Sequence, residues 1–238
     1  MFPYDPQLAA DVLNPPPTID GVLTLMQSID STCQVTDGLK WFNWLYMTVT
    51  QAVKNKVDAG AFQDGAWLTD LDVQFAALYF HALHAALTGA PCPACWNSMF
   101  QVRNQVKIAR IQFALAGMNA HIIHDLPMAI VSTCKTTNVV PQHGTPQYTD
   151  YTAINAVLDG IIEPAKQTLN VTLVGDCLPD VSHVEDMIAG WGLADFREKA
   201  WNTAQTLWGA PASAQTAIID VIDTLVKGMN TLLLVPEP

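Results

Sequence analysis

Residues 112–127 read QFALAGMNAHIIHDLP, and this stretch decides how the chain folds. Its apolar residues recur at helical spacing, and its small residues allow close packing against a neighbouring helix. These small residues are Ala114, Ala116, Gly117 and Ala120. We therefore predict a helix within the core. Pro127 should kink or restart it, because a proline inside a helix costs about 3 kcal/mol.

Four polar residues interrupt the apolar surround of this helix, namely Asn119, His121, His124 and Asp125. Spacings of three and four place the last three side chains on one helical face. Buried polar groups are costly unless they are paired. The group therefore indicates either a satisfied hydrogen-bond network or a functional site. We favour the site, because no other part of the chain gathers so much titratable chemistry in an apolar setting.

Helical periodicity continues over most of the chain. It predicts a short helix from Thr18 and further helices over 39–59, 67–87, 150–169, 183–208 and 213–234. A long helix is expected to begin near Trp96 and to run into the central stretch. Residues 171–174 are the only credible strand candidate. The prediction is an all-α fold of about seven to nine helices.

Two regions follow from the distribution of proline and of apolar residues. Residues 1–17 are proline-rich and are expected to form an extended N-terminal arm on the surface. Residues 18–238 are expected to form a single helical domain. No fixed repeat and no low-complexity segment divides them further.

Composition excludes several classes of function. Half of the 238 residues are hydrophobic and 14% are charged, which indicates a sizeable core. The net charge is −11, and the 11 Lys and Arg residues are scattered, which argues against binding to nucleic acid or anionic lipid. No stretch approaches the ~20 apolar residues of a membrane span, and the N-terminus does not resemble a signal peptide. We expect a cytoplasmic protein.

Five cysteines include one C-x-x-C pair, Cys92 and Cys95. No second pair follows in the sequence to complete a zinc site, and no βαβ pattern supports a thioredoxin-like motif. Two buried thiols at a helix start and a local disulfide both fit this spacing.

A metal site is one hypothesis for the central helix. His121 and Asp125 are spaced as i and i+4, His124 offers a third ligand, and His81 and His84 lie on another predicted helix. Such ligands suit zinc or iron in a hydrolase. The adjacent residues His124 and Asp125, however, cannot both point fully towards an ion that His121 binds.

The second hypothesis is an apolar pocket that folds a small molecule into a reactive shape. Holding a near-attack conformer is worth up to about 7–11 kcal/mol, and a few donors stabilise charge that develops on a carbonyl. His121, His124 and Asn119 would be the donors, and Asp125 would orient a histidine. The expected substrate-binding residues are Trp44, Tyr46, Tyr79, Phe80, His81, Phe113 and Met118. We expect no cofactor and no metal for such a cyclase. A non-catalytic carrier of hydrophobic ligands is a third hypothesis.

Several segments resemble the DUF5995 family of uncharacterised helical proteins. They are WFNWLY at 41–46, TVT at 48–50, LDVQFAALYF at 71–80, and 112–121 together with 125–127. The resemblance covers about residues 38–170 and implies a shared helical fold without implying an activity.

Two further resemblances bear on chemistry. Residues 121–127 are similar to the His-x-x-x-Asp helix of zinc-dependent phospholipase C and P1-type nucleases. The chain also resembles fungal proteins encoded with terpenoid or polyketide pathways, including a norbornene-forming Diels–Alderase of the sordarin type. This second resemblance implies a [4+2] cyclase that acts on an apolar, unsaturated metabolite.

Overall fold

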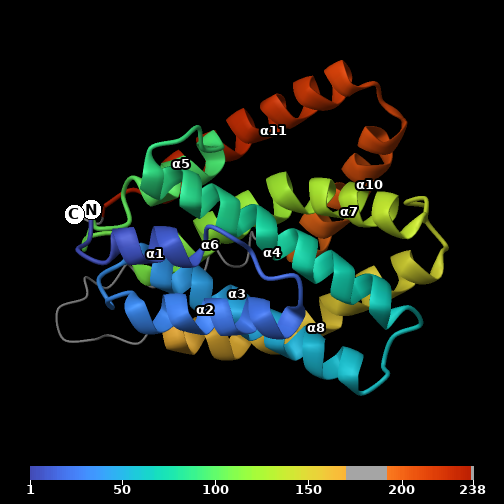
Figure 1. The fold of residues 1–238 in the computed structure, drawn as a ribbon, viewed down its shortest axis with the longest axis horizontal. Coiled ribbons are helices and arrows are strands. Elements are labelled where there is room, and N and C mark those ends of the chain that lie inside the picture. Colours follow the sequence, from blue (N-terminus) through green and yellow to red (C-terminus); the bar gives the residue numbers. More distant parts are fainter. Residues whose placement is uncertain (170–191, 237–238) are drawn as a thin grey trace.

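Every regular element that the structure describes is a helix (Figure 1). The structure is a computed structural model, and it describes residues 1–169 and 192–236. The helices are α1 (Asp5–Asp11), α2 (Ile19–Thr32), α3 (Gly38–Asp58), α4 (Gly65–Thr88), α5 (Ala94–Phe100), α6 (Arg110–Asn119), the π-helix η1 (Ala120–Asp125), α7 (Leu126–Thr137), α8 (Pro146–Leu169), α10 (Leu193–Gly209) and α11 (Ala212–Leu233). The predicted all-α class is confirmed over these residues.

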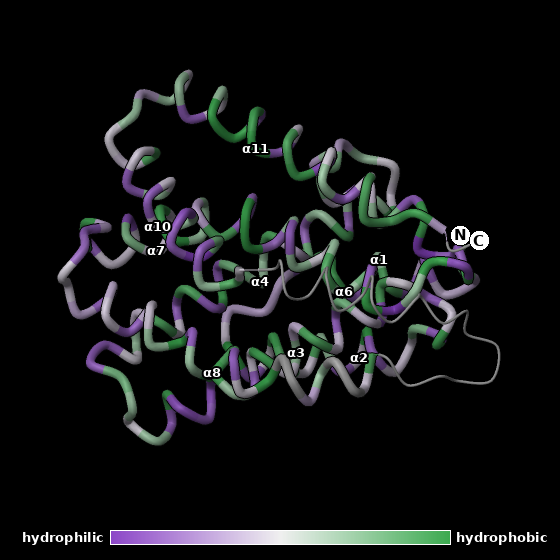
Figure 2. The backbone as a smooth tube through the Cα atoms, turned by 180° about the vertical axis from the view of Figure 1, so that it is seen from behind, coloured by the Kyte–Doolittle hydropathy of each residue, from purple (hydrophilic) through white to green (hydrophobic). Residues whose placement is uncertain are grey.

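The helices stack in three layers around the central stretch (Figure 1). Helices α2, α3 and α8 form one outer layer, and α5, α10 and α11 form the other. Between them lie α4, α6, η1 and α7; of these, α4 and α6 contact both outer layers, while η1 and α7 contact α10. Figure 2 shows from behind that hydrophobic residues continue along much of α11. The helix predicted at 112–127 is therefore central, although it is divided into three elements.

Close packing of α6 on α3 depends on two glycines. A Cβ added at Gly117 would lie 2.3 Å from the ring of Phe42, and one added at Gly38 would lie 2.4 Å from the ring of Phe113. Because rings in a packed core cannot retreat without opening voids, larger residues at either position would push the two helices apart. The prediction that small residues permit close contact is confirmed at Gly117.

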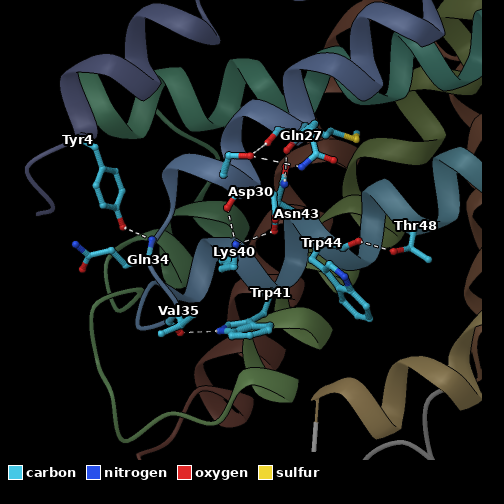
Figure 3. A network of polar contacts seen from close by, with 12 residues as sticks. Tyr4, Gln27, Asp30, Gln34, Val35, Lys40, Trp41, Asn43, Trp44 and Thr48 are labelled. Atoms are coloured by element: carbon cyan, nitrogen blue, oxygen red, sulfur yellow. Dashed lines mark hydrogen bonds and ion pairs between the residues drawn. The ribbon is translucent and has the colours of Figure 1, made fainter. Parts of the chain in front are cut away.

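Side-chain contacts from α2 fix the rotation of α3 (Figure 3). The amide nitrogen of Asn43 donates to the carbonyl of Met26 at 2.9 Å, and Lys40 pairs with Asp30 at 3.0 Å. The Asn43 oxygen also accepts from the Tyr79 hydroxyl of α4 at 3.3 Å. These bonds hold the face of α3 that carries Tyr46 towards the centre of the molecule.

The expected continuous helix from Trp96 into the central stretch is wrong. Helix α5 ends at Phe100, and α6 begins only at Arg110. Between them the carbonyl of Arg103 accepts the Gly38 amide at 2.7 Å, and its guanidinium pairs with two buried aspartates. These long-range bonds outweigh the local tendency towards helix.

The N-terminal arm also differs from the expected extended segment. Residues Asp5–Asp11 form α1, and Leu8 and Val12 are fully buried. Its proline, Pro6, stands in the first turn, where a missing N–H removes no helical hydrogen bond. The strand candidate at 171–174 and the start of the helix expected at 183 lie outside the described residues.

Candidate functional site

The site begins with a local change of helix type. Between α6 and α7 the chain forms the π-helix η1, in which the Leu126 amide donates to the carbonyl of His121, five residues earlier. Pro127 explains this change, because it offers no N–H and its ring would crowd the carbonyl of Ile123. Widening the turn relieves that conflict, and α7 starts at Leu126. Such π-turns are frequent at functional sites.

Asp125 is the centre of a buried network. Its Oδ2 accepts from Trp96 Nε1 at 2.9 Å and from His121 Nδ1 at 3.1 Å, while its Oδ1 accepts from His124 Nδ1 at 2.7 Å. All four side chains are buried. Three of the four predicted catalytic residues are thus brought together, and Trp96 joins them from α5.

The charges of this network follow from its hydrogen bonds. Burial alone would raise the pKa of Asp125, but the bonds from both histidines outweigh it and hold that pKa below its usual value. Burial lowers the pKa of His121 despite the carboxylate, so its imidazole is neutral. Its Nδ1 faces the ionised carboxylate and carries the proton, which leaves a lone pair on Nε2. His121 is therefore a base or hydrogen-bond acceptor, rather than the donor expected from the sequence.

Apart from its bond to Asp125, the His121 imidazole is surrounded by aromatic rings. It stacks on Phe75 with ring centroids 3.4 Å apart, and Tyr46 lies edge-on at 4.3 Å. The rings of Phe42 and Trp96 follow at 5.8 and 5.9 Å. Within the described part of the chain, Nε2 has no hydrogen-bond partner.

Three further polar side chains, on α3 and α4, also have a buried atom that makes no well-formed hydrogen bond among the described residues, although the hydroxyls of Tyr46 and Thr50 lie close enough to interact with each other. They are the Tyr46 hydroxyl, the Thr50 hydroxyl and one carboxylate oxygen of Asp72. Thr50 lies one turn after Tyr46 on α3, and Asp72 lies one turn before Phe75 on α4. We call His121, Tyr46, Thr50 and Asp72 the open polar cluster. A buried polar atom without a hydrogen-bond partner carries a cost in free energy, so these atoms are candidates to bind water or the polar groups of a ligand.

The protonation of the cluster favours donation from Tyr46. Burial raises the pKa of Tyr46 well above its usual value, so the phenol stays neutral and can donate. Burial also raises the pKa of Asp72 to about 7, against the opposing charge of Arg197. Below about pH 7 the cluster therefore combines the neutral acceptor of His121 with neutral donors from two other helices, and near pH 7 Asp72 is about half ionised.

The other predicted site residues lie farther from His121 or serve packing. Asn119 donates to Asn230 at 3.3 Å and so joins α6 to α11. Tyr79 lies 6.4 Å from the His121 ring by centroid, with Phe80 packed on it at 5.1 Å. Phe113 and Met118 are buried in the core, Trp44 is half-buried, and His81 is exposed.

Three members of the arrangement were not foreseen. The sequence could have indicated Asp72, because an acidic residue stands one turn before Phe75 on a strongly apolar helix. The sequence could not have indicated Thr50 or Trp96, since their roles depend on contacts between distant helices.

The metal ligands expected from the sequence are placed differently by the structure. Both oxygens of Asp125 already accept N–H groups, and His84 Nδ1 lies 3.0 Å from the carbonyl of Ala9. The group of described residues able to hold a metal ion is Cys95, His124 and Asp223. Cys92 and Cys95 are free thiols, so the alternative of a local disulfide is wrong.

A separate surface pocket of about 230 Å³ lies at the opposite end of α4 from Asp72. Asp5, Leu83, Phe100 and Arg103 are among the residues that line it. None of the predicted catalytic residues does so. No helix in the described ranges is both long enough and apolar enough to cross a membrane.

Comparisons with known proteins place the chain in a family without assigning it a function. The model of DUF5995, described as a family of unknown function, matches residues 19–236. No curated protein and no solved structure matches the chain.

Proposed function

The chain belongs to the DUF5995 family, which has no known function, and from that premise we propose that it is a cofactor-independent cyclase. Its substrate would be an apolar, unsaturated terpenoid or polyketide intermediate that carries a carbonyl group. A [4+2] cycloaddition is the reaction that we propose first. Two π bonds are then exchanged for two carbon–carbon σ bonds, and no atom or electron enters or leaves.

One observation carries this proposal: a buried acceptor and a buried donor are carried by two neighbouring rings within an aromatic surround. His121 Nε2 and the Tyr46 hydroxyl both lack a hydrogen-bond partner among the described residues, and their rings are 4.3 Å apart by centroid. A substrate carbonyl would accept from Tyr46, which withdraws electron density from a conjugated dienophile. A substrate hydroxyl would donate to His121 Nε2.

The Asp125 network would hold His121 in the state that this role requires. The bond to Asp125 fixes the proton on Nδ1, and the stack on Phe75 fixes the plane of the ring. Trp96 in turn anchors the carboxylate. The acceptor is thereby oriented before substrate binds, so little reorganisation is needed in the reaction.

The remaining polar atoms fit the same substrate. Protonated Asp72 would add a second donor to the carbonyl, and Thr50 would bond either partner. The rings of Phe75 and Tyr79 would press the hydrocarbon chain into a folded conformer. Preorganisation of this kind contributes up to about 7–11 kcal/mol to a ring closure.

The test uses a linear polyene that carries a diene, a tethered α,β-unsaturated aldehyde and a hydroxyl group. Conversion and product stereochemistry are measured by chiral chromatography with and without the purified protein. We expect faster closure and a single stereoisomer with the wild type. Tyr46→Phe and His121→Phe should each lower kcat by about 10²–10³-fold, the loss typical of one oriented hydrogen-bonding group.

Matched substitutions control for the loss of a hydroxyl or an imidazole as such. Tyr148 and His143 form a solvent-facing pair with Glu198, away from the open polar cluster. Tyr148→Phe and His143→Phe should therefore retain wild-type kcat. Saturable binding of the polyene without turnover would replace the cyclase with a carrier. Turnover that survives both cluster substitutions would overturn the proposed site.

A further inference from the structure

A second group of ligating side chains lies on the far side of the Asp125 network from His121. Cys95 comes from the first turn of α5, His124 from η1 and Asp223 from the middle of α11. One ligand atom from each of the three lies within 4.8 Å of the others. Segments far apart in the sequence thus converge on one point, and none of these atoms belongs to the open polar cluster.

Neighbouring groups hold two of the three ligands in place. The carboxylate of Asp223 accepts from the amides of Ala94 and Cys95 at 2.9 and 2.8 Å. His124 Nδ1 is engaged by Asp125 at 2.7 Å, which leaves Nε2 as the nitrogen available to an ion. A carboxylate behind a histidine is the usual support of a metal-bound imidazole, because it fixes the tautomer and the ring plane.

The charges at this point favour a cation over a nucleophilic thiol. The carboxylate of Asp223 accepts the Cys95 amide, and that of Asp125 also lies near Cys95, so negative charge surrounds this thiol. A catalytic cysteine instead needs surroundings that stabilise the thiolate. A bound dication would supply that stabilisation, since a coordinating thiol is deprotonated by the ion itself.

We propose that Cys95, His124 and Asp223 bind Zn²⁺, with Cys92 as the fourth ligand. A mixed sulfur, nitrogen and oxygen set suits zinc, whose tetrahedral ligands stand roughly 3.5 Å apart. The three ligand atoms, now within 4.8 Å of one another, would draw together to that spacing, and Cys92, which lies outside this group, would move in to complete the site. Cys92 precedes Cys95 at the C-x-x-C spacing of zinc ligands, and its thiol now makes weak S–H hydrogen bonds, at 3.4 and 3.5 Å, to two carbonyls.

Zinc at this position would brace the structure behind the proposed cyclase site. The ion would join α5, η1 and α11, and it would fix His124 and thereby Asp125. It would not touch the open polar cluster. The zinc site therefore stands or falls separately from the cyclase.

The test uses tag-free, full-length protein that has been stripped with a chelator and titrated with Co²⁺ or Zn²⁺ alone. We expect one equivalent of Co²⁺ to produce a thiolate-to-cobalt charge-transfer band. Zn²⁺ at a hundredfold excess over its dissociation constant should raise Tm by about 5–10 °C. Wild-type protein that shows neither response would overturn the proposal without any variant.

Variants then identify the ligands. Cys95→Ser should abolish the charge-transfer band or reduce it strongly, and Asp223→Asn should weaken Zn²⁺ binding by at least tenfold. Cys134→Ser is the matched control, because this free thiol is as fully buried as that of Cys95 but lies on α7. Equal binding by Cys95→Ser and Cys134→Ser would overturn the site. Full affinity in Cys92→Ser would remove Cys92 from it.

Discussion

Two buried polar networks lie within this fold, and they differ in whether all of their polar atoms have hydrogen-bond partners. Arg103 donates to Asp37 through Nε and Nη2 at 2.9 and 2.6 Å, and to Asp5 at 2.8 Å. Asp37 also accepts from Tyr4 and Leu39, and Asp5 accepts from Phe2, so every oxygen of both carboxylates has a hydrogen-bond partner. The Asp125 network instead leads, through His121, to atoms without hydrogen-bond partners in the described ranges.

This difference separates a structural network from a functional one. In a closed network, in which every polar atom has a partner, the hydrogen bonds offset the free-energy cost of desolvating the charges. The fold alone therefore explains such a network. In an open network, some buried polar atoms have no partner, so the free-energy cost of desolvating them is not offset. Such a network needs another explanation. Thr133, Trp67 and Trp201 also bury an unpaired atom. The open polar cluster differs from them because two neighbouring rings in it carry an acceptor and a donor.

The largest expected effect comes from breaking the closed network. Arg103→Met should lower the free energy of unfolding by about 3–5 kcal/mol, because two buried carboxylates lose their cation. Urea denaturation measures the loss. Lys56→Met removes an exposed cation and should change stability by less than about 0.5 kcal/mol. Equal effects of the two substitutions would show that the Arg103 network does not stabilise the fold.

The next effect is a pH dependence that comes from Asp72. Its pKa is raised from 3.8 to about 7 in the folded protein, so the unfolded chain releases this proton first as the pH rises. Stability should therefore fall between about pH 4 and pH 8, by on the order of 2–4 kcal/mol for this half-buried group. Tyr46 faces Asp72 from α3, and the opposing charge of Arg197 comes from α10.

Asp72→Asn isolates that contribution. Subtracting its stability curve from that of the wild type cancels the titration of all other groups. The difference should be small at about pH 4, and the wild type should be the less stable protein at about pH 8. A flat difference curve would mean that Asp72 titrates as it does in the unfolded chain and would remove it as a neutral donor.

A smaller effect tests the anchor of the open network. Trp96→Phe removes the N–H that Asp125 accepts at 2.9 Å and should cost about 1.5–3 kcal/mol beyond the smaller ring. Trp201→Phe shrinks an equally buried ring whose N–H has no partner among the described residues, so it gives the cost of the smaller ring, less the small gain from removing an unpaired N–H. If urea denaturation gives the same loss for both variants, the bond from Trp96 contributes nothing to stability.

The sequence allowed prediction of those features that depend on neighbours along the chain. Helical periodicity located the core helix, Gly117 indicated close contact, and spacing placed His121 and Asp125 on one face. It could not show the break after Phe100, because the partners of Arg103 lie 66 and 98 residues away. The contact of Cys95 with Asp223 spans 128 residues and was hidden for the same reason.

The smallest expected effect is on the free energy of unfolding, and its sign distinguishes a buried hydroxyl without a partner from one that is hydrogen-bonded. Tyr46→Phe removes a buried hydroxyl without a partner in the described chain, and it should raise the free energy of unfolding by about 0.5–1 kcal/mol. Tyr79→Phe removes a hydroxyl that donates to Asn43 at 3.3 Å, and it should lower that free energy by about 1 kcal/mol. Both residues are buried in the same aromatic cluster, so ring packing cancels between them. A loss of stability in Tyr46→Phe equal to that in Tyr79→Phe would mean that the Tyr46 hydroxyl is satisfied within the fold and is not held ready for a substrate.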